Sequence, residues 1–216
     1  FNKVHTGIDC PVKRAVSPEV ICRLMTDRKP LPGKLAFSRD LFVLLFLLRG
    51  MPFVDLAFLR RCDLQGNVIT YHRRKTSRKL TVVVGKEAME IIQKYMYANP
   101  DSPYLFPIIQ NPGKDEYGQY ARMLRLQNYR LTQVAHILGI RDRLSTYTAR
   151  HTWATTALRQ NYNSSLICDA MGHSSVKVTE TYFQPYRDDE VNRMNSSLIT
   201  YILSKKKKGA DKNLRS

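Results

Sequence analysis

The stretch from Ser38 to Arg49 is apolar on nearly all sides, and it constrains the fold more than any other part of the chain. A helix that is apolar all round is stable where other elements surround it. Its uninterrupted apolar part, Leu41–Leu48, is too short to cross a bilayer, which takes about 20 residues. We therefore expect one compact domain built around a buried central helix that ends at Gly50.

Helical patterns surround a single pair of strand patterns. Ser17 and Pro18 mark one helix start, and Pro52 marks another after the central helix. The β-branched runs Asn67–His72 and Leu80–Val84 predict an antiparallel hairpin with a basic turn. Further helices are expected over residues 85–97, 120–138, 164–171 and 175–182. Another helix starts with Ser145 or Thr146 as its cap, and a last one follows residue 188. The sequence thus predicts a mainly α fold with a small antiparallel β-sheet.

The chain is strongly basic, with 35 lysines and arginines against 18 aspartates and glutamates and a net charge of +17. This balance favours a face that binds nucleic acid, although ribosomal proteins and membrane-surface binders are also basic. The cysteines at positions 10, 22, 62 and 168 are far apart and include no CxxC pair. We interpret them as reduced thiols of a cytosolic protein, without a disulfide or a zinc site. The polar first residues do not resemble a signal peptide.

The residues from Leu144 to Tyr186 concentrate side chains that can act on a phosphodiester. They include Arg150, then His173 in a Met-Gly-His sequence, then Tyr182 nine residues later. A phenol, a guanidinium and an imidazole brought together by short helices can break a phosphodiester without a metal. This pattern resembles the tyrosine recombinases of the phage integrase family, which read His-x-x-Arg, then Leu-Gly-His, then a nucleophilic tyrosine nine residues on.

The resemblance assigns roles to four residues. Tyr182 would attack a DNA phosphate to form a 3′-phosphotyrosyl link, which stores the bond energy so that rejoining needs no ATP, metal or other cofactor. Arg150 would hold the phosphate, and His173 would donate to the same phosphate or manage the Tyr182 proton. Lys75, on the hairpin turn, would protonate the departing 5′-oxygen. Ordinary structural roles remain open for each, such as core packing for one of twelve tyrosines.

The sequence departs from the family pattern at two places. Tyr147 stands where the family most often has histidine, so we expect it to position the phosphate rather than to titrate. Pro52 stands where the family has its first catalytic arginine, within an Arg-Gly-Met-x-Phe-Val-Asp motif that is similar to a bacterial subgroup. Our hypothesis is that Arg49 supplies the second guanidinium and Asp55 orients the basic cluster. Alternatively, Arg49 is a charge at a helix C-terminus, where the dipole favours cations.

The resemblance also implies partners and boundaries. The basic turn would contact DNA phosphates through Arg73, Arg74, Arg78 and Lys79. Such enzymes act as tetramers on double-stranded DNA in the bacterial cytoplasm and carry an N-terminal DNA-binding domain that this chain lacks. The expected organisation is a linker (1–15), a tyrosine recombinase catalytic domain (16–187), a C-terminal helix that docks in cis or in trans (188–204), and a disordered basic tail (205–216).

Three functions compete at this point. The first is a site-specific recombinase of the integrase or invertase type. The second is a DNA relaxer similar to type IB topoisomerases, which shares the chemistry but acts as a monomer without sequence choice. The third is a DNA-binding protein of the same fold that does not cleave, which the loss of the usual arginine and histidine makes plausible. The retained Lys75, Arg150, His173 and Tyr182 favour an active recombinase.

Overall fold

The computed structural model describes residues 15–98, 100–180 and 192–200 of the chain. Two compact units are present, Phe1–Phe183 and Gln184–Ser216. In the second unit, residues 192–200 form a helix, which agrees with the helix expected after residue 188. Within the described ranges, no helix is both long enough and apolar enough to cross a membrane.

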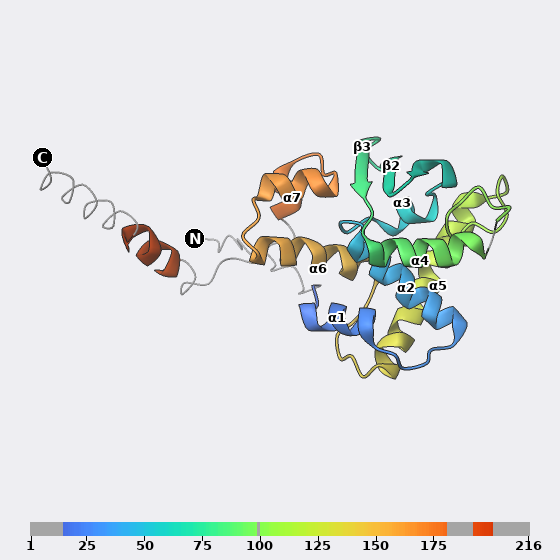
Figure 1. The fold of residues 1–216 in the computed structure, drawn as a ribbon, viewed down its shortest axis with the longest axis horizontal. Helices are drawn as coiled ribbons and strands as arrows, with labels where there is room; N and C mark the ends of the chain where they lie inside the picture. Colours follow the sequence, from blue (N-terminus) through green and yellow to red (C-terminus); the bar gives the residue numbers. More distant parts are fainter. Residues whose placement is uncertain (1–14, 99, 181–191, 201–216) are drawn as a thin grey trace, which may run out of the picture. The chain divides into compact units, whose positions relative to one another are not determined.

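The central element of the first unit is α2, which runs through the middle of the helical body (Figure 1). It contacts four other helices, and Leu41, Phe42, Leu44 and Leu45 have no exposed surface. The burial of this apolar segment confirms the predicted central helix, because packing on all sides is what removes its surface from water. Helix α2 spans Gly33–Leu47, and the helices around it are α1 (Pro18–Thr26), α4 (Lys86–Tyr97), α5 (Glu116–Ile137) and α6 (Thr146–Arg159).

The ends of α2 differ from the sequence prediction. The helix begins at Gly33 rather than Ser38, directly after Pro32. A proline ring breaks the interior of a helix but is tolerated at its start. It ends at Leu47, because Arg49 and Gly50 both adopt left-handed backbone angles, with φ of 60° and 66°. Two consecutive left-handed residues turn the chain away from the helix axis, so the stop comes before the glycine.

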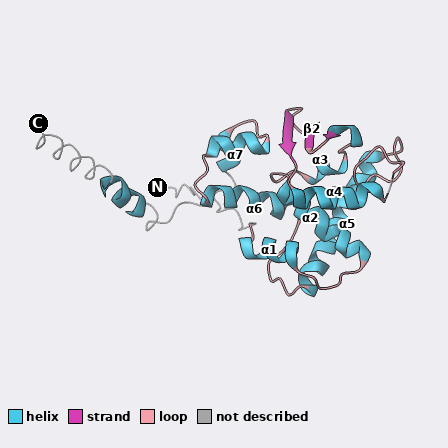
Figure 2. Cartoon of the chain, in the orientation of Figure 1, coloured by secondary structure: helices cyan, strands magenta, loops and turns pink. Residues whose placement is uncertain are grey.

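The predicted hairpin is present as part of a three-stranded antiparallel sheet (Figure 2). Strands β2 (Val68–His72) and β3 (Lys79–Val83) pair with Thr70 opposite Thr81. The third strand, β1 (Leu64–Gln65), has only two residues and follows the short 3-10 helix Arg61–Asp63. Such a short strand leaves no alternating pattern in the sequence, which is why sequence reasoning did not find it.

Local capping explains where α5 and α6 begin. The side chain of Asp115 accepts a hydrogen bond from the backbone N–H of Gly118, so α5 begins at residue 116 rather than at the predicted 120. Ser145 caps α6 through the N–H of Thr148, which decides between the two caps considered above. The shorter helices are α3 (Phe53–Ala57), α7 (Ser164–Met171) and α8 (Val176–Glu180).

Candidate functional site

Arg150 lies one turn inside α6, and the start of that helix is fixed from two directions. Ser145 caps it, and the backbone N–H of Thr146 donates to the Asn128 side chain of α5 at 2.9 Å. The C-terminal half of α6 packs through Ala154 on a small apolar cluster that α7 completes. The position of Arg150 is therefore set by the packing of three helices.

The Arg150 guanidinium is buried and points toward the segment that follows α7. Its Nη1 donates to the carbonyl oxygen of Gly50, and its Nη2 lies 3.0 Å from the Met171 carbonyl oxygen and 2.6 Å from His173 Nε2. The close approach depends on glycine, because a Cβ at position 50 would lie 3.1 Å from Arg150 Cα and the backbone there is left-handed. Arg150 thus ties the end of α2 to the His173 loop.

His173 follows the left-handed Gly172 that ends α7. Its imidazole is buried, and its Nδ1 lies 2.7 Å from the Thr179 hydroxyl oxygen of α8. Burial, and after it the nearby charges of Arg150, Arg73 and Lys75, together lower the pKa of His173 to about 4. The imidazole is therefore neutral at pH 7 in the DNA-free domain.

A stability prediction follows from this pKa. The unfolded chain binds a proton on histidine near pH 6.5, whereas the folded chain binds it on His173 only near pH 4. Between these values protons favour the unfolded state, so the free energy of unfolding should fall as the pH drops from about 6.5 to about 4. Urea unfolding at several pH values should show a shallower fall for His173→Gln than for the wild type. His136→Gln, an exposed change on α5, is the control, and equal slopes for wild type and His173→Gln would contradict the assignment.

The basic turn after β2 is anchored to the same loop. Arg73 is buried, its Nε lies 3.3 Å from Asp55 Oδ2, and its Nη1 donates to the carbonyl oxygens of Met171 and Gly172 at 3.0 and 2.7 Å. The backbone N–H of Arg74 donates to the other Asp55 oxygen. Burial raises the pKa of Asp55, although the Arg74 N–H and the Arg73 charge oppose this effect. Asp55 therefore contacts the basic turn at two points.

Gly172 is required where Arg73 crosses the loop. Its backbone is left-handed, with φ of 65°, and a Cβ there would lie 2.7 Å from Arg73 Cδ and 2.7 Å from a Leu80 methyl. A side chain at this position would strain the backbone and push Arg73 from the Met171 carbonyl. The glycine before His173 is thus explained by the close passage of an arginine side chain from the hairpin turn.

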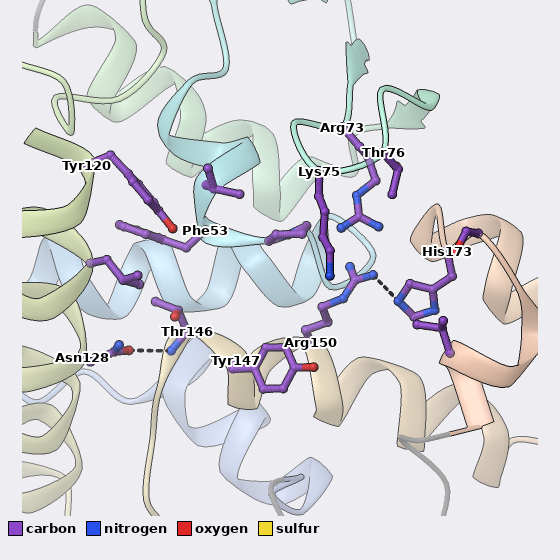
Figure 3. Close-up of a pocket in the computed structure, with 15 residues that line it drawn as sticks. Phe53, Arg73, Lys75, Thr76, Tyr120, Asn128, Thr146, Tyr147, Arg150 and His173 are labelled. Atoms are coloured by element: carbon purple, nitrogen blue, oxygen red, sulfur yellow. Dashed lines mark hydrogen bonds between the residues drawn. The ribbon is translucent and has the colours of Figure 1, made fainter. Parts of the chain in front are cut away.

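These side chains border a cavity of about 550 Å³. Figure 3 shows Lys75 and Arg150 pointing toward one another from opposite walls, with Arg73 and His173 on the same side. Of the described residues that line the cavity, three carry a positive charge and none carries a carboxylate. Such a cavity attracts an anion. The uncharged polar residues along the wall are Thr76, Tyr120, Asn128, Thr146, Tyr147 and Ser174.

Arg49 lies elsewhere in this structure. Its side chain donates to the carbonyl oxygen of Thr81 on β3 at 3.3 Å, and it borders a separate cavity with Trp153 and Leu166. The left-handed turn at residues 49 and 50 directs it there while it brings the Gly50 carbonyl oxygen to Arg150. This placement does not support Arg49 as the second guanidinium of the cavity, and Arg73 stands near Arg150 instead.

The remaining predicted residues differ in their placement. Tyr147 is partly exposed, lines the cavity and packs edge-on against His151, with ring centroids 4.5 Å apart. The Arg74 guanidinium lies 3.8 Å from the centre of the Phe58 ring, and Lys79 begins β3 on the exposed side. Arg78 binds the His173 carbonyl oxygen and the Asp169 carboxylate, each at 2.9 Å. The predicted nucleophile at position 182 lies outside the described residues.

Comparison with known proteins gives matches over most of the chain. Residues 15–188 match the sequence profile of the phage integrase family. The tyrosine recombinase XerC of Thermodesulfovibrio yellowstonii is 26% identical over 166 residues, which cover 71% of this chain and 52% of XerC. This chain therefore spans about half the length of that relative.

Solved structures show a similar fold at low sequence identity. XerA recombinase has a TM-score of 0.61 and 20% identity, over 91% of this chain and 66% of XerA. The Tn1549 transposon integrase, in complex with transposon right end DNA, has a TM-score of 0.64 and 14% identity, over 88% of this chain and 68% of the integrase chain. The mainly α fold with its small antiparallel sheet is thus the fold of tyrosine recombinase catalytic domains.

Proposed function

Since the chain belongs to the phage integrase family, we propose that it is the catalytic part of a site-specific DNA recombinase that cleaves and rejoins DNA through Tyr182. The observation that carries the proposal is the convergence of Lys75, Arg150 and His173, from three separate parts of the chain, on one cationic cavity. A DNA phosphodiester is an anion that such a cavity accommodates, and charge-assisted hydrogen bonds favour it strongly.

The proposed cleavage step uses each of these groups once. The Tyr182 oxygen attacks phosphorus, the bond to the 5′-oxygen breaks, and a 3′-phosphotyrosyl link forms. Lys75 gives a proton to the departing oxygen. When Arg150 turns from His173 Nε2 to the phosphate oxygens, it stabilises the charge that builds on them. The Nε2 lone pair of the neutral His173 is then released to accept the phenol proton. Rejoining reverses these transfers, so the covalent link conserves the energy of the broken bond.

We assign the second guanidinium of this site to Arg73 rather than to Arg49. Arg73 lines the cavity and shares the Met171 carbonyl oxygen with Arg150, so the two guanidinium groups are neighbours. Asp55 holds Arg73 in place through its carboxylate. Position 52, where the family pattern has an arginine, is a proline that also lines the cavity. The charge missing at position 52 would thus come from the hairpin turn.

A pair of substitutions tests this assignment. Arg73→Lys should slow covalent adduct formation by about 10- to 100-fold, because lysine keeps the charge but loses the planar fork. Arg49→Ala should change the rate by less than about threefold, since its side chain borders a different cavity. Rates are measured with saturating DNA after thermal unfolding shows that both variants are folded. The opposite order of effects would return the role to Arg49.

The function itself is tested by trapping. The 216-residue chain is incubated, with EDTA and without ATP, with a pool of nicked duplexes of randomised sequence, and covalent protein–DNA adducts are recovered and sequenced. The proposal expects a tyrosine-linked 3′-phosphate, a free 5′-hydroxyl on the released strand, and enrichment of particular sequences. Adducts without sequence enrichment would indicate a DNA relaxer. Binding without any adduct would indicate a protein that binds DNA but does not cleave it.

The wider assembly is part of the proposal. XerH and the Tn1549 integrase were solved on DNA, which supports double-stranded DNA as the partner of this chain. We place the catalytic domain at residues 16–187 and expect a second, N-terminal DNA-binding domain in the whole protein. The helix after residue 188 would join neighbouring copies in a tetramer on DNA in the bacterial cytoplasm. Light scattering with and without a recovered DNA site would measure that assembly.

A further inference from the structure

His173 is held through both of its ring nitrogens, and the two contacts together decide where its proton lies. Arg150 Nη2 lies 2.6 Å from Nε2, and a guanidinium is a donor without acceptor capacity. Nε2 must therefore accept, which leaves the ring proton of the neutral imidazole on Nδ1. That proton is donated to the Thr179 hydroxyl oxygen at 2.7 Å.

Thr179 is placed to do more than fill space. It has no exposed surface, and it lies on α8, six residues after His173 and three residues before Tyr182. A histidine ring in a functional site is commonly oriented by the partner of its second nitrogen. The same hydroxyl also joins the helix that leads to Tyr182 to the loop that carries His173.

Resting on the proposed function, we propose that Thr179 is a positioning residue for DNA cleavage. Its hydroxyl accepts the Nδ1 proton of His173 and so keeps the lone pair on Nε2. That lone pair accepts from Arg150 in the DNA-free domain and becomes available for the Tyr182 proton once Arg150 turns to the phosphate. Without this acceptor, the proton could move to Nε2. There it would point at the Arg150 donor and could not accept a proton from the phenol.

The charges around the imidazole are consistent with this role. Among the described residues, the charged groups that shift its pKa are the guanidinium of Arg150 from α6 and the side chains of Arg73 and Lys75 from the hairpin turn, and these three are cationic. Arg78 binds the backbone carbonyl oxygen of His173 rather than its ring. These charges disfavour an imidazolium, so the choice at neutral pH is between the two neutral tautomers, and the Thr179 hydroxyl selects one of them.

Two substitutions at position 179 separate positioning from packing. Thr179→Val keeps the shape and removes the hydroxyl, whereas Thr179→Ser keeps the hydroxyl and removes the methyl group. We expect Thr179→Val to slow adduct formation by about 10- to 100-fold, the usual cost of losing a partner that orients a functional histidine. Thr179→Ser should stay within about threefold of wild type. A packing role predicts the reverse order, and that result would overturn the proposal.

The tautomer is measured on the DNA-free chain by ¹⁵N NMR of the imidazole, so this part does not depend on cleavage. Wild type should show a protonated Nδ1 and an unprotonated Nε2 on His173 at pH 7, and Thr179→Val should lose that preference. A protonated Nε2 in the wild type, or normal cleavage by a folded Thr179→Val, would overturn the proposal. Absence of any adduct with wild-type protein would instead remove the proposed function on which it rests.

Discussion

Tyr182→Phe is expected to abolish covalent adduct formation while noncovalent DNA binding stays within about twofold of wild type. The substitution removes the oxygen that attacks phosphorus in the proposed step, and without a nucleophile no covalent link forms. It changes no charge, so the salt-dependent attraction to phosphates is retained. Adducts are counted on denaturing gels with the recovered nicked DNA, and binding is measured by fluorescence anisotropy with an intact duplex of the same sequence.

The matched control for this experiment is Tyr147→Phe. Tyr147 lines the cavity together with Arg150. Of the described residues, Tyr147 and Tyr120 are the tyrosines that line this cavity, so their phenols are the alternative nucleophiles. We expect Tyr147→Phe to reduce the rate by about tenfold or less, because its phenol would only position the phosphate. An adduct that persists in Tyr182→Phe and maps by mass spectrometry to position 147 or 120 would move the chemistry to that residue.

The parts of the fold that sequence reasoning predicted are those with strong local periodicity. The central helix and the two strands of the hairpin were found because most residues along them follow one pattern. The errors lie at boundaries, where single residues decide. Pro32 and Asp115 start two helices earlier than periodicity indicates, and the left-handed Arg49 ends α2 before Gly50. Backbone angles of this kind leave little trace in residue type.

The residues of the candidate site were likewise predicted only in part. Arg150 and His173 follow from motif spacing and Lys75 from the resemblance of the hairpin turn to the family, and the structure brings their side chains to one cavity. The proposal of Arg73 in place of Arg49 could not come from the sequence, because it rests on carbonyl oxygens of Met171 and Gly172 about a hundred positions away. Thr179 was missed for a similar reason. Its spacing from the histidine matches no local pattern, and its partner is reached only through the turn between α7 and α8.

Arg150→Lys is expected to lower the rate of adduct formation by about a thousandfold, the upper part of the range for losing one transition-state donor. A lysine ammonium cannot bind the carbonyl oxygens of Gly50 and Met171, meet His173 Nε2 and hold a phosphate at the same time, because its donors leave one atom. The same buried acceptors would lose partners, so the unfolding free energy should also fall by about 1–3 kcal/mol.

Single-turnover cleavage with saturating DNA separates these two effects, provided that it is run at a temperature where urea titration shows Arg150→Lys to be folded. Arg23→Lys, on the exposed face of α1, is the control for a general arginine-to-lysine effect and should cleave like wild type. A folded Arg150→Lys that cleaves at the wild-type rate would show that Arg73 and Lys75 suffice to hold the phosphate. The proposed division of roles within the cavity would then be wrong.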